Sequence, residues 1–403
     1  MMSCQKSLLA FACLVLLQAP GVRANEGDVL NLSATLSSMR DDNLFRLAPS
    51  VDPKSVGLDG KSDTITTMTL GLNFNKLFGL QRLIANVSLV DNRYKTNDYL
   101  DFQALNYDAK WLWAAGTRWT GELAVDRNES LNSFSDYRNF RVRNVRTIEN
   151  ERFSANYWFH SNWAAVVGVS RYSLTNEQPF LADSDYDANG YNYGLRYRPL
   201  SGNTVTVRAK HLDGTYSKRQ FNSTLQYDNG FVQDSYELDA DWRLTGKSQV
   251  RGRLEYLARK HDHFADRDYD GWVGNLDFAY AATAKGSLNL GYKHGLETFQ
   301  QLTSSYYVLD ELTLATKWAA TSTLTATARL GYGLRSYKGE IVALPAGTEQ
   351  REDKFTRVGF DLAYLPVRWV ELKAGVAYEN RNVNYDSLDY KDRIGFVSAS
   401  AQY

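Results

Sequence analysis

Basic side chains occupy alternate positions along several segments in the middle of the sequence. Residues two apart in a β-strand lie on the same face, so such pairs would share one surface. Guanidinium groups bind carboxylates through two parallel hydrogen bonds and also donate to hydroxyl groups, which suits them to acidic sugars. We therefore predict a substrate path lined by Arg196, Arg198, Arg208, Lys210, Arg243, Arg251 and Arg253.

Acidic residues are interleaved with these cations, and they leave a second interpretation open. Opposite charges on neighbouring strands attract each other, and such pairs would keep a water-filled interior polar without selecting a solute. The alternative is an excess of arginine that attracts anions along the path. The acids concerned are Glu237, Asp239, Asp241, Glu255 and Asp277.

Two segments match the first half of a calcium-binding loop, D-x-D-x-[DN]-G. The candidate ligands are Asp185, Asp187 and Asn189 in the first segment, and Asp266, Asp268 and Asp270 in the second. The bidentate Glu of such a loop is missing, because its place is taken by Arg196 and Asp277. We therefore predict acidic turns rather than a metal site.

The sequence shows none of the residue patterns that indicate an enzyme. It has no nucleophile elbow, no Ser/His/Asp arrangement and no phosphate-binding loop. Its five histidines are scattered along the chain. We predict a protein without catalytic residues and without a cofactor.

The segments that carry these residues alternate between apolar and polar positions. One example is Tyr236, Leu238, Ala240 and Trp242, which alternate with charged residues. This period of two indicates β-strands with one apolar and one polar face. About eighteen such segments follow one another, and short connections alternate with long ones. The pattern predicts an all-β protein, a transmembrane antiparallel up-and-down β-barrel whose short turns lie in the periplasm.

Tryptophans gather near the predicted short turns. Amphipathic rings prefer the headgroup layer of a membrane, so a ring of tryptophans at one end of the wall indicates an interfacial girdle. The last strand ends on Tyr403, and we interpret this terminal aromatic residue as an insertion signal. The girdle residues are Trp111, Trp113, Trp119, Trp163, Trp242, Trp318 and Trp369.

The first residues predict secretion. Lys6 precedes the apolar run Leu8–Leu17, and Val22-Arg23-Ala24 fits the cleavage rule of signal peptides. We expect residues 1–24 to be a signal peptide and residues 25–403 to be one barrel domain in the outer membrane of a Gram-negative bacterium. Both cysteines precede the expected cleavage site. The mean hydropathy of −0.44 is compatible with a barrel, whose wall needs only alternate apolar residues. Lysine and arginine balance aspartate and glutamate at 46 each, so net charge indicates no nucleic-acid partner.

Other classes of outer-membrane barrel have the same kind of wall. A general diffusion porin for small solutes would use the same wall, with Met39–Asp63 or Lys218–Asp234 folded inward as a constriction loop. A structural or adhesive barrel with a plugged lumen is a further alternative. A receptor with a plug domain would need more residues before the first strand at Leu30 than the expected mature chain supplies.

The first third of the chain contains a series of short motifs. They are Asp41, Asp42, Asn43, Leu44, Phe45 and Arg46, followed by Leu47, Ser62-Asp63, Gly79-Leu80-Gln81-Arg82, Tyr94, Leu100-Asp101-Phe102, Trp111, Trp113 and Gly121-Glu122-Leu123. In these residues the chain resembles the EpsL family. These are outer-membrane proteins associated with exopolysaccharide biosynthesis and export. The resemblance implies a barrel that passes a polysaccharide. Its implied partners are the outer-membrane lipid bilayer, lipopolysaccharide, the barrel assembly machinery and periplasmic export components.

Overall fold

The computed structural model describes residues 29–135, 141–224, 227–301, 304–339, 349–385 and 388–403. The expected signal peptide, residues 1–24, lies outside this part of the chain, as do Cys4 and Cys13. No helix among the described residues is long and apolar enough to cross a membrane.

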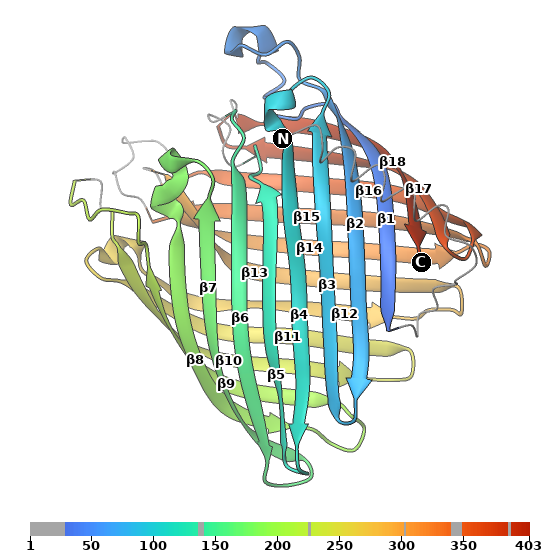
Figure 1. The fold of residues 1–403 in the computed structure, drawn as a ribbon. Helices are drawn as coiled ribbons and strands as arrows, with labels where there is room; N and C mark the ends of the chain where they lie inside the picture. Colours follow the sequence, from blue (N-terminus) through green and yellow to red (C-terminus); the bar gives the residue numbers. More distant parts are fainter. Residues whose placement is uncertain (1–28, 136–140, 225–226, 302–303, 340–348, 386–387) are drawn as a thin grey trace, which may run out of the picture.

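Eighteen antiparallel strands form one sheet that closes on itself (Figure 1). Each strand pairs with its neighbours in the sequence, and β1 also pairs with β18, so the sheet has no free edge. The predicted fold, with about eighteen strands, is confirmed. The strands are β1 (Leu30–Asp41), β2 (Asp63–Phe78), β3 (Gln81–Tyr94), β4 (Phe102–Ala115), β5 (Trp119–Leu131), β6 (Val145–Trp158), β7 (Trp163–Asn176), β8 (Tyr186–Tyr197), β9 (Thr204–Thr215), β10 (Gly230–Arg243), β11 (Ser248–His261), β12 (Tyr269–Tyr280), β13 (Gly286–Gln301), β14 (Ser304–Ala319), β15 (Leu324–Lys338), β16 (Glu352–Val367), β17 (Val370–Val383) and β18 (Tyr390–Gln402).

Connections at the two ends of the barrel differ in length. The short turns after the even-numbered strands include 79–80, 116–118 and 368–369, whereas the connections after the odd-numbered strands include 42–62, 132–144 and 216–229. One exception is the brief step from β13 to β14. The end with the longer connections also carries four 3₁₀ helices: η1 (Pro53–Val56), η2 (Asp98–Leu100), η3 (Pro179–Ser184) and η4 (Ala265–Arg267). In Figure 1 the first three of these lie together at one rim. We call this the outer end, because long loops face outward in barrels of this kind.

The two faces of the wall have opposite character. Large apolar side chains cover the outside, and many are strongly exposed, such as Leu36 at 52% and Val397 at 58%. The intervening positions point into the lumen, and several of their charged side chains are buried there, including Glu237, Glu255 and Asp361. An apolar exterior around a polar interior is the arrangement that a lipid bilayer requires.

One local prediction was wrong. The sequence pattern predicts a turn at Pro366-Val367, after the strand that contains Val358, Phe360, Leu362 and Tyr364, but β16 continues through Val367 and the turn is 368–369. The pairing of β16 with β17 shifts register between Tyr364 and Val367. Proline cannot donate to a strand ladder and is tolerated at such an irregularity. Its presence therefore marked a bulge and not the turn itself.

The larger cluster of buried hydrophobic side chains among the described residues lies at the outer end. Leu44, Phe45 and Leu47 from loop 42–62 pack against Ile65, Leu100 and Phe134. The rings of Phe45 and Phe134 meet edge to face at 4.8 Å. This cluster joins the first outer loop to strands β2 and β3 and to the connection after β5, and it fixes the loops that frame the mouth of the lumen.

Candidate functional site: the lumen of the barrel

The basic residues predicted to line a path belong to β8–β11 and to the turn after β8; we call them the arginine wall. Three of them are compensated by carboxylates. Arg208 lies 2.5 Å from Glu237, and Lys210 bridges Glu237 at 3.1 Å and Glu255 at 2.9 Å. Arg251 lies 3.3 Å from Asp241. At these three positions the cations pair with carboxylates on neighbouring strands, which is the first of the two interpretations that the sequence left open.

The other four members have no carboxylate partner within the described chain. Arg196 donates from Nε to the Thr206 hydroxyl at 3.1 Å, and Arg198 stacks over the buried Trp158 ring at 4.0 Å. The side chains of Arg243 and Arg253 are exposed, and no ion pair is found for either among the residues that the structure describes. An excess of positive charge therefore remains on this side of the lumen, and it comes from fewer residues than the sequence suggested.

A second set of ion pairs lines the wall formed by β14–β17. Arg357 lies 2.9 Å from Glu311 and 2.8 Å from Glu379, so one guanidinium joins three strands. Asp361 pairs with Arg329 and lies 3.4 Å from Lys373. These pairs cross strands at successive heights of the wall, and they keep its inner surface hydrated without a large net charge.

Buried charges hold a loop across the outer mouth. Asp353 accepts hydrogen bonds from Arg351 at 2.8 and 2.9 Å, from Arg381 Nε at 2.8 Å and from the Tyr337 hydroxyl at 3.0 Å. Arg381 also donates from Nη1 to the carbonyl of Ser135 at 3.4 Å. We call Tyr337, Arg351, Asp353 and Arg381 the mouth cluster; Asp353 and Arg381 are almost completely buried.

Ser135 belongs to the connection between β5 and β6, whereas Arg381 lies on β17. Five other strands separate β5 from β17 around the barrel, so the described residues 132–135 reach from β5 over the mouth to β17. The sequence pattern predicts 39–63 or 218–234 as constriction loops and gives no sign of this one. The polar residues of 132–135 carry no signal that distinguishes them from other surface loops.

The residues that carry the EpsL resemblance fasten the first outer loop to the last strand. Arg46 lies 2.9 Å from Asp41 of β1 and 3.0 Å from Asp392 of β18. Asn43 donates to the carbonyls of Leu47 and Lys391 at 2.9 Å, and Arg393 N–H donates to Asp42 at 2.7 Å. Leu44 and Phe45 enter the hydrophobic core. The motif therefore stabilises the junction at which the barrel closes.

Replacing Arg46 by Ala should destabilise this junction, because two buried carboxylates would lose their shared cation. Arg46 is partly exposed, so we expect a loss of about 2–3 kcal/mol, below the full cost of breaking a buried pair. The measurement is urea unfolding in lipid vesicles, followed by gel migration. The matched control is Arg40→Ala, which removes an exposed arginine from the same segment. An equal effect of both substitutions would contradict this role.

The predicted calcium motifs do not form compact loops. Asp185 is buried, where it accepts from Asn176 N–H at 2.8 Å and from Lys218 at 2.9 Å. Asp187 and Asn189 belong to strand β8. In the second motif, Asp268 accepts from His261 N–H at 2.7 Å and Asp270 accepts from the Tyr256 hydroxyl at 3.0 Å, while Asp266 lies in η4. Asp185, Asp268 and Asp270 accept hydrogen bonds from neighbouring loop and strand residues and so help to hold the loops and the wall in place.

A different acidic cluster organises the outer loops after β9 and β11. Asp228 is buried and accepts from His263 N–H at 2.6 Å, from the His263 ring at 3.0 Å and from Asn229 N–H at 2.9 Å. Burial alone would raise the pKa of the Asp228 carboxyl, but these hydrogen bonds hold that pKa below its ordinary value. The side chains of Asp228, Asp262 and His263 are close enough to one another to share a cation. The oxygens of Asp228 are already used, so we propose no metal.

Acidification should loosen these two loops. A carboxyl whose pKa is depressed in the folded state stabilises that state above its unfolded pKa of about 4, and the contribution is lost as the pH falls further. We expect faster hydrogen exchange of 216–224 and 262–268 below about pH 4, after correction for intrinsic rates. In Asp228→Asn the exchange should already be fast at neutral pH and should change little on acidification. Acid-induced loosening that persists in Asp228→Asn would rule out this carboxyl as its cause.

The predicted girdle residues lie toward the turn end of the wall. Trp119 and Trp163 begin their strands directly after short turns, and Trp242 and Trp318 are next to last in theirs. Trp369 lies within the turn 368–369, and Trp111 and Trp113 lie in the last turn-side residues of β4. The rings of Trp119 and Trp163 contact Tyr157 and Tyr197 at 4.9 Å. Tyr403 follows β18 at the same end, where it exchanges two backbone hydrogen bonds with Leu32.

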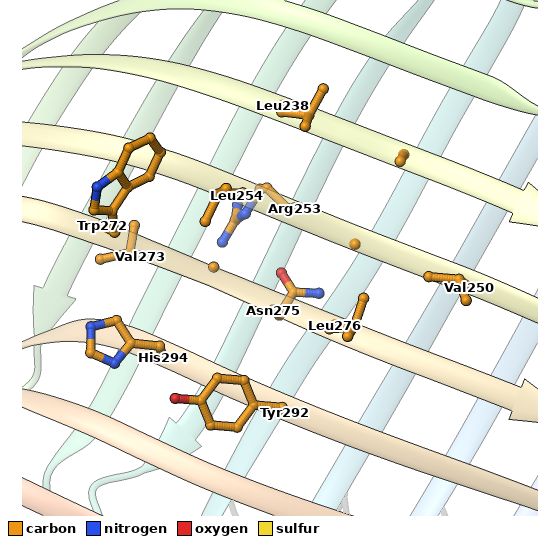
Figure 2. Close-up of a pocket in the computed structure, with 13 residues that line it drawn as sticks. Leu238, Val250, Arg253, Leu254, Trp272, Val273, Asn275, Leu276, Tyr292 and His294 are labelled. Carbon is orange, nitrogen blue, oxygen red and sulfur yellow. The ribbon is translucent and has the colours of Figure 1, made fainter.

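A hollow in the wall between β10 and β13 is not part of the solute path. Figure 2 shows Leu238, Leu254, Trp272, Leu276 and Tyr292 around it. These side chains belong to the apolar face that is exposed on the outside of the barrel, and Gly252 and Gly274 create the space between them. The hollow therefore faces the membrane, whereas the charged path lies on the opposite side of the same strands.

Comparison with known proteins identifies the family. Residues 167–403, more than half of the chain, match the family model described as "Putative beta-barrel porin 2". The chain belongs to this family. It is therefore an outer-membrane β-barrel porin, a channel and not an enzyme. No curated protein matches the sequence significantly.

Solved structures support the fold of this porin. It resembles OccK1 (OpdK) of Pseudomonas aeruginosa with a TM-score of 0.50 and 12% identity, over 93% of this chain and 99% of that one. It resembles OccK2 (OpdF) of the same organism with a TM-score of 0.51 and 12% identity, over 93% and 98% of the two chains. OccK2 has also been solved in complex with glucuronate. At this identity the likeness concerns the fold alone.

Proposed function

We propose that this porin passes an exopolysaccharide across the outer membrane through its lumen, as part of a biosynthesis and export system. The observation that carries the proposal is the uneven charge of the lumen, in which arginines without an ion pair gather on β8–β11 and the rest of the wall is polar. Arg196, Arg243 and Arg253 would lower the barrier for uronate or pyruvate carboxylates.

The number of strands supports a wide path. Barrels of sixteen to eighteen strands leave an aqueous channel, whereas barrels of eight strands are filled by their own side chains. A sugar carboxylate is also the kind of group that the glucuronate-bound OccK2 accommodates. Together these features suit a hydrated, acidic polymer better than an apolar solute.

The EpsL resemblance supplies the biological setting of the proposal. Its motif residues, Asp41 to Arg46, fasten the first loop to β18 and do not touch a solute path directly, except for Arg46, which borders the lumen beside Arg329 and Arg357. We propose that lipopolysaccharide surrounds the barrel, that the barrel assembly machinery inserts it, and that periplasmic export components deliver the polymer. We further propose that residues 1–24 are removed on secretion.

A general diffusion porin is the second candidate, because the family description names a porin and no polysaccharide. The two candidates differ in what binds inside the lumen. A diffusion porin shows brief, featureless passage of small solutes, whereas an export path has repeated weak sites for sugar units.

The test is single-channel recording of the purified porin in planar bilayers. We expect stable conductance and resolved blocking events when oligogalacturonate is added on the turn side. Channels that conduct ions but show no block by any oligosaccharide would support the diffusion porin. An absence of conductance would support a plugged structural barrel.

A further inference from the structure

Four neighbouring strands present an uncharged inner surface to the middle of the lumen. On β18, β1, β2 and β3, most lumen-facing positions between the two ends carry hydroxyl or amide groups, with Gly71 and Val90 among them as exceptions. We call this surface the hydroxyl track; it consists of Ser33, Thr35, Ser37, Thr67, Thr69, Asn73, Asn86, Ser88, Ser398 and Ser400.

The strand register makes these side chains neighbours. Thr35 is paired with Ser400 on one side and with Thr69 on the other, and Ser37 lies in the same way between Ser398 and Thr67. Asn73 is paired with Asn86. The track is therefore one continuous patch across the junction of the first and last strands.

The orientation of the track follows from the residues between its members. Leu36, Leu72 and Val397 alternate with them and are strongly exposed on the membrane side. Successive side chains of a strand point to opposite faces, so the track faces the lumen. Its members are partly buried, as expected for short side chains on a concave wall.

Most of these polar groups are not used within the protein. Thr35 and Ser400 share a hydrogen bond of 2.9 Å, Thr67 donates to Asn92 at 2.8 Å and Asn86 donates to Asp108. In the described part of the chain, Ser37, Thr69 and Ser398 have no side-chain hydrogen-bond partner. Their hydroxyls can bond to water or to a solute, and each can both donate and accept.

Charged side chains border the hydroxyl track on the β17 side. On β17, Glu371 is paired with Ser400 and Lys373 with Ser398, and ion pairs line β14–β17 beyond them. The arginine wall lies on β8–β11, well away from the track in the strand order. A solute in the lumen therefore meets charged groups on one part of the wall and neutral hydroxyls on another.

We infer that the hydroxyl track is a binding surface for the hydroxyl faces of neutral sugar residues, while acidic substituents are held by the arginine wall. This inference rests on the proposed export of a polysaccharide and names the part of the polymer that each surface recognises. Neutral hydrogen bonds are weak one by one, so a sugar unit binds several hydroxyls and still leaves quickly. Such weak, repeated sites are what conduction requires.

The test compares block of single channels by two probes, maltohexaose and hexagalacturonate. The track variant is Ser37→Ala, Thr69→Val and Ser398→Ala together. The matched control is Ser154→Ala, Ser170→Ala and Thr327→Val, which changes the same residue types at lumen positions outside the track. Unchanged ion conductance and gel migration establish that both variants are folded.

We expect the residence time of maltohexaose to fall about tenfold in the track variant, and that of hexagalacturonate to fall about twofold, because each lost hydrogen bond weakens binding modestly. The control should match the unmodified porin. An unchanged maltohexaose residence time, or an equal fall in the control, would overturn the inference. If hexagalacturonate blocks the unmodified porin and maltohexaose does not, the inference fails and the proposed function stands. If neither probe blocks it, both fail.

Discussion

Replacing Asp353 by Asn should lower the free energy of unfolding by about 3–5 kcal/mol and should raise the ion conductance of the channel. Asp353 is fully buried and accepts hydrogen bonds from Arg351, Arg381 and Tyr337. Without this negative charge, Arg351 and Arg381 would lose the buried carboxylate that they share at the mouth, and removing one partner is the costly way to break a buried pair. Conductance should rise because Arg381 would no longer be held where it binds Ser135 of the crossing loop.

The measurement combines urea unfolding in vesicles with single-channel recording. Glu352→Gln is the matched control, because Glu352 is the exposed neighbour of Asp353 on β16 and its carboxylate makes no ion pair within the described residues. Loss of stability without a change in conductance would show that the mouth cluster does not hold the crossing loop in the ion path. Normal stability of Asp353→Asn would contradict the compensation that the buried contacts imply.

Replacing Arg196, Arg243 and Arg253 by Gln together should remove the anion preference of the channel. A unit charge about 7 Å from a permeating ion contributes roughly 0.6 kcal/mol in water, a factor of about 2.7. Three such factors multiply to roughly twenty, so the three charges together should change the permeability ratio of anions to cations by roughly twentyfold at low salt. The effect should shrink at high salt, because counterions screen exposed charges.

Reversal potentials in a salt gradient measure this ratio. The control replaces Lys247, Lys285 and Arg368 by Gln, which removes the same charge from the short turns. Arg208 and Arg251 are left in place, because their loss would strand Glu237 and Asp241. An unchanged permeability ratio would show that arginines without a carboxylate partner do not set the selectivity.

The sequence allowed the fold to be predicted because the alternation of apolar and polar residues is a local property. Leu238 and Glu237 are enough to distinguish the membrane face of β10 from its lumen face, and the number of such segments gave the number of strands. The turn near Pro366 was misplaced by two residues, because a strand with a register shift can contain proline.

Contacts between distant segments could not be predicted in the same way. Asp310 interrupts the apolar face of β14, and nothing near it in the sequence offers compensation. In the structure, strand pairing brings His294 opposite Asp310, with the His294 ring at 2.7 Å and the Tyr292 hydroxyl also at 2.7 Å. The same limit hid the contact of Ser135 with Arg381, which depends on how far a loop extends across the mouth.

The sequence allowed us to predict which charged residues line the lumen, but not which of them form ion pairs. The charged residues were identified from their spacing, but which arginines are paired depends on the register between strands. Arg208 lies opposite Glu237, whereas Arg253 lies opposite Asp239 without an ion pair between them among the described contacts. Side-chain length and local packing decide such cases, and a one-dimensional pattern contains neither.

The most direct test of polysaccharide export is the location of the polymer in a strain that lacks this protein. Total polysaccharide should be measured separately in the medium, the periplasm and the cells, and again after complementation with the unmodified gene. We expect the polymer to disappear from the medium, because it is either held back in the cell or no longer made. It should return to the medium on complementation. Normal secretion together with reduced uptake of small solutes would contradict this expectation and would identify a general diffusion porin.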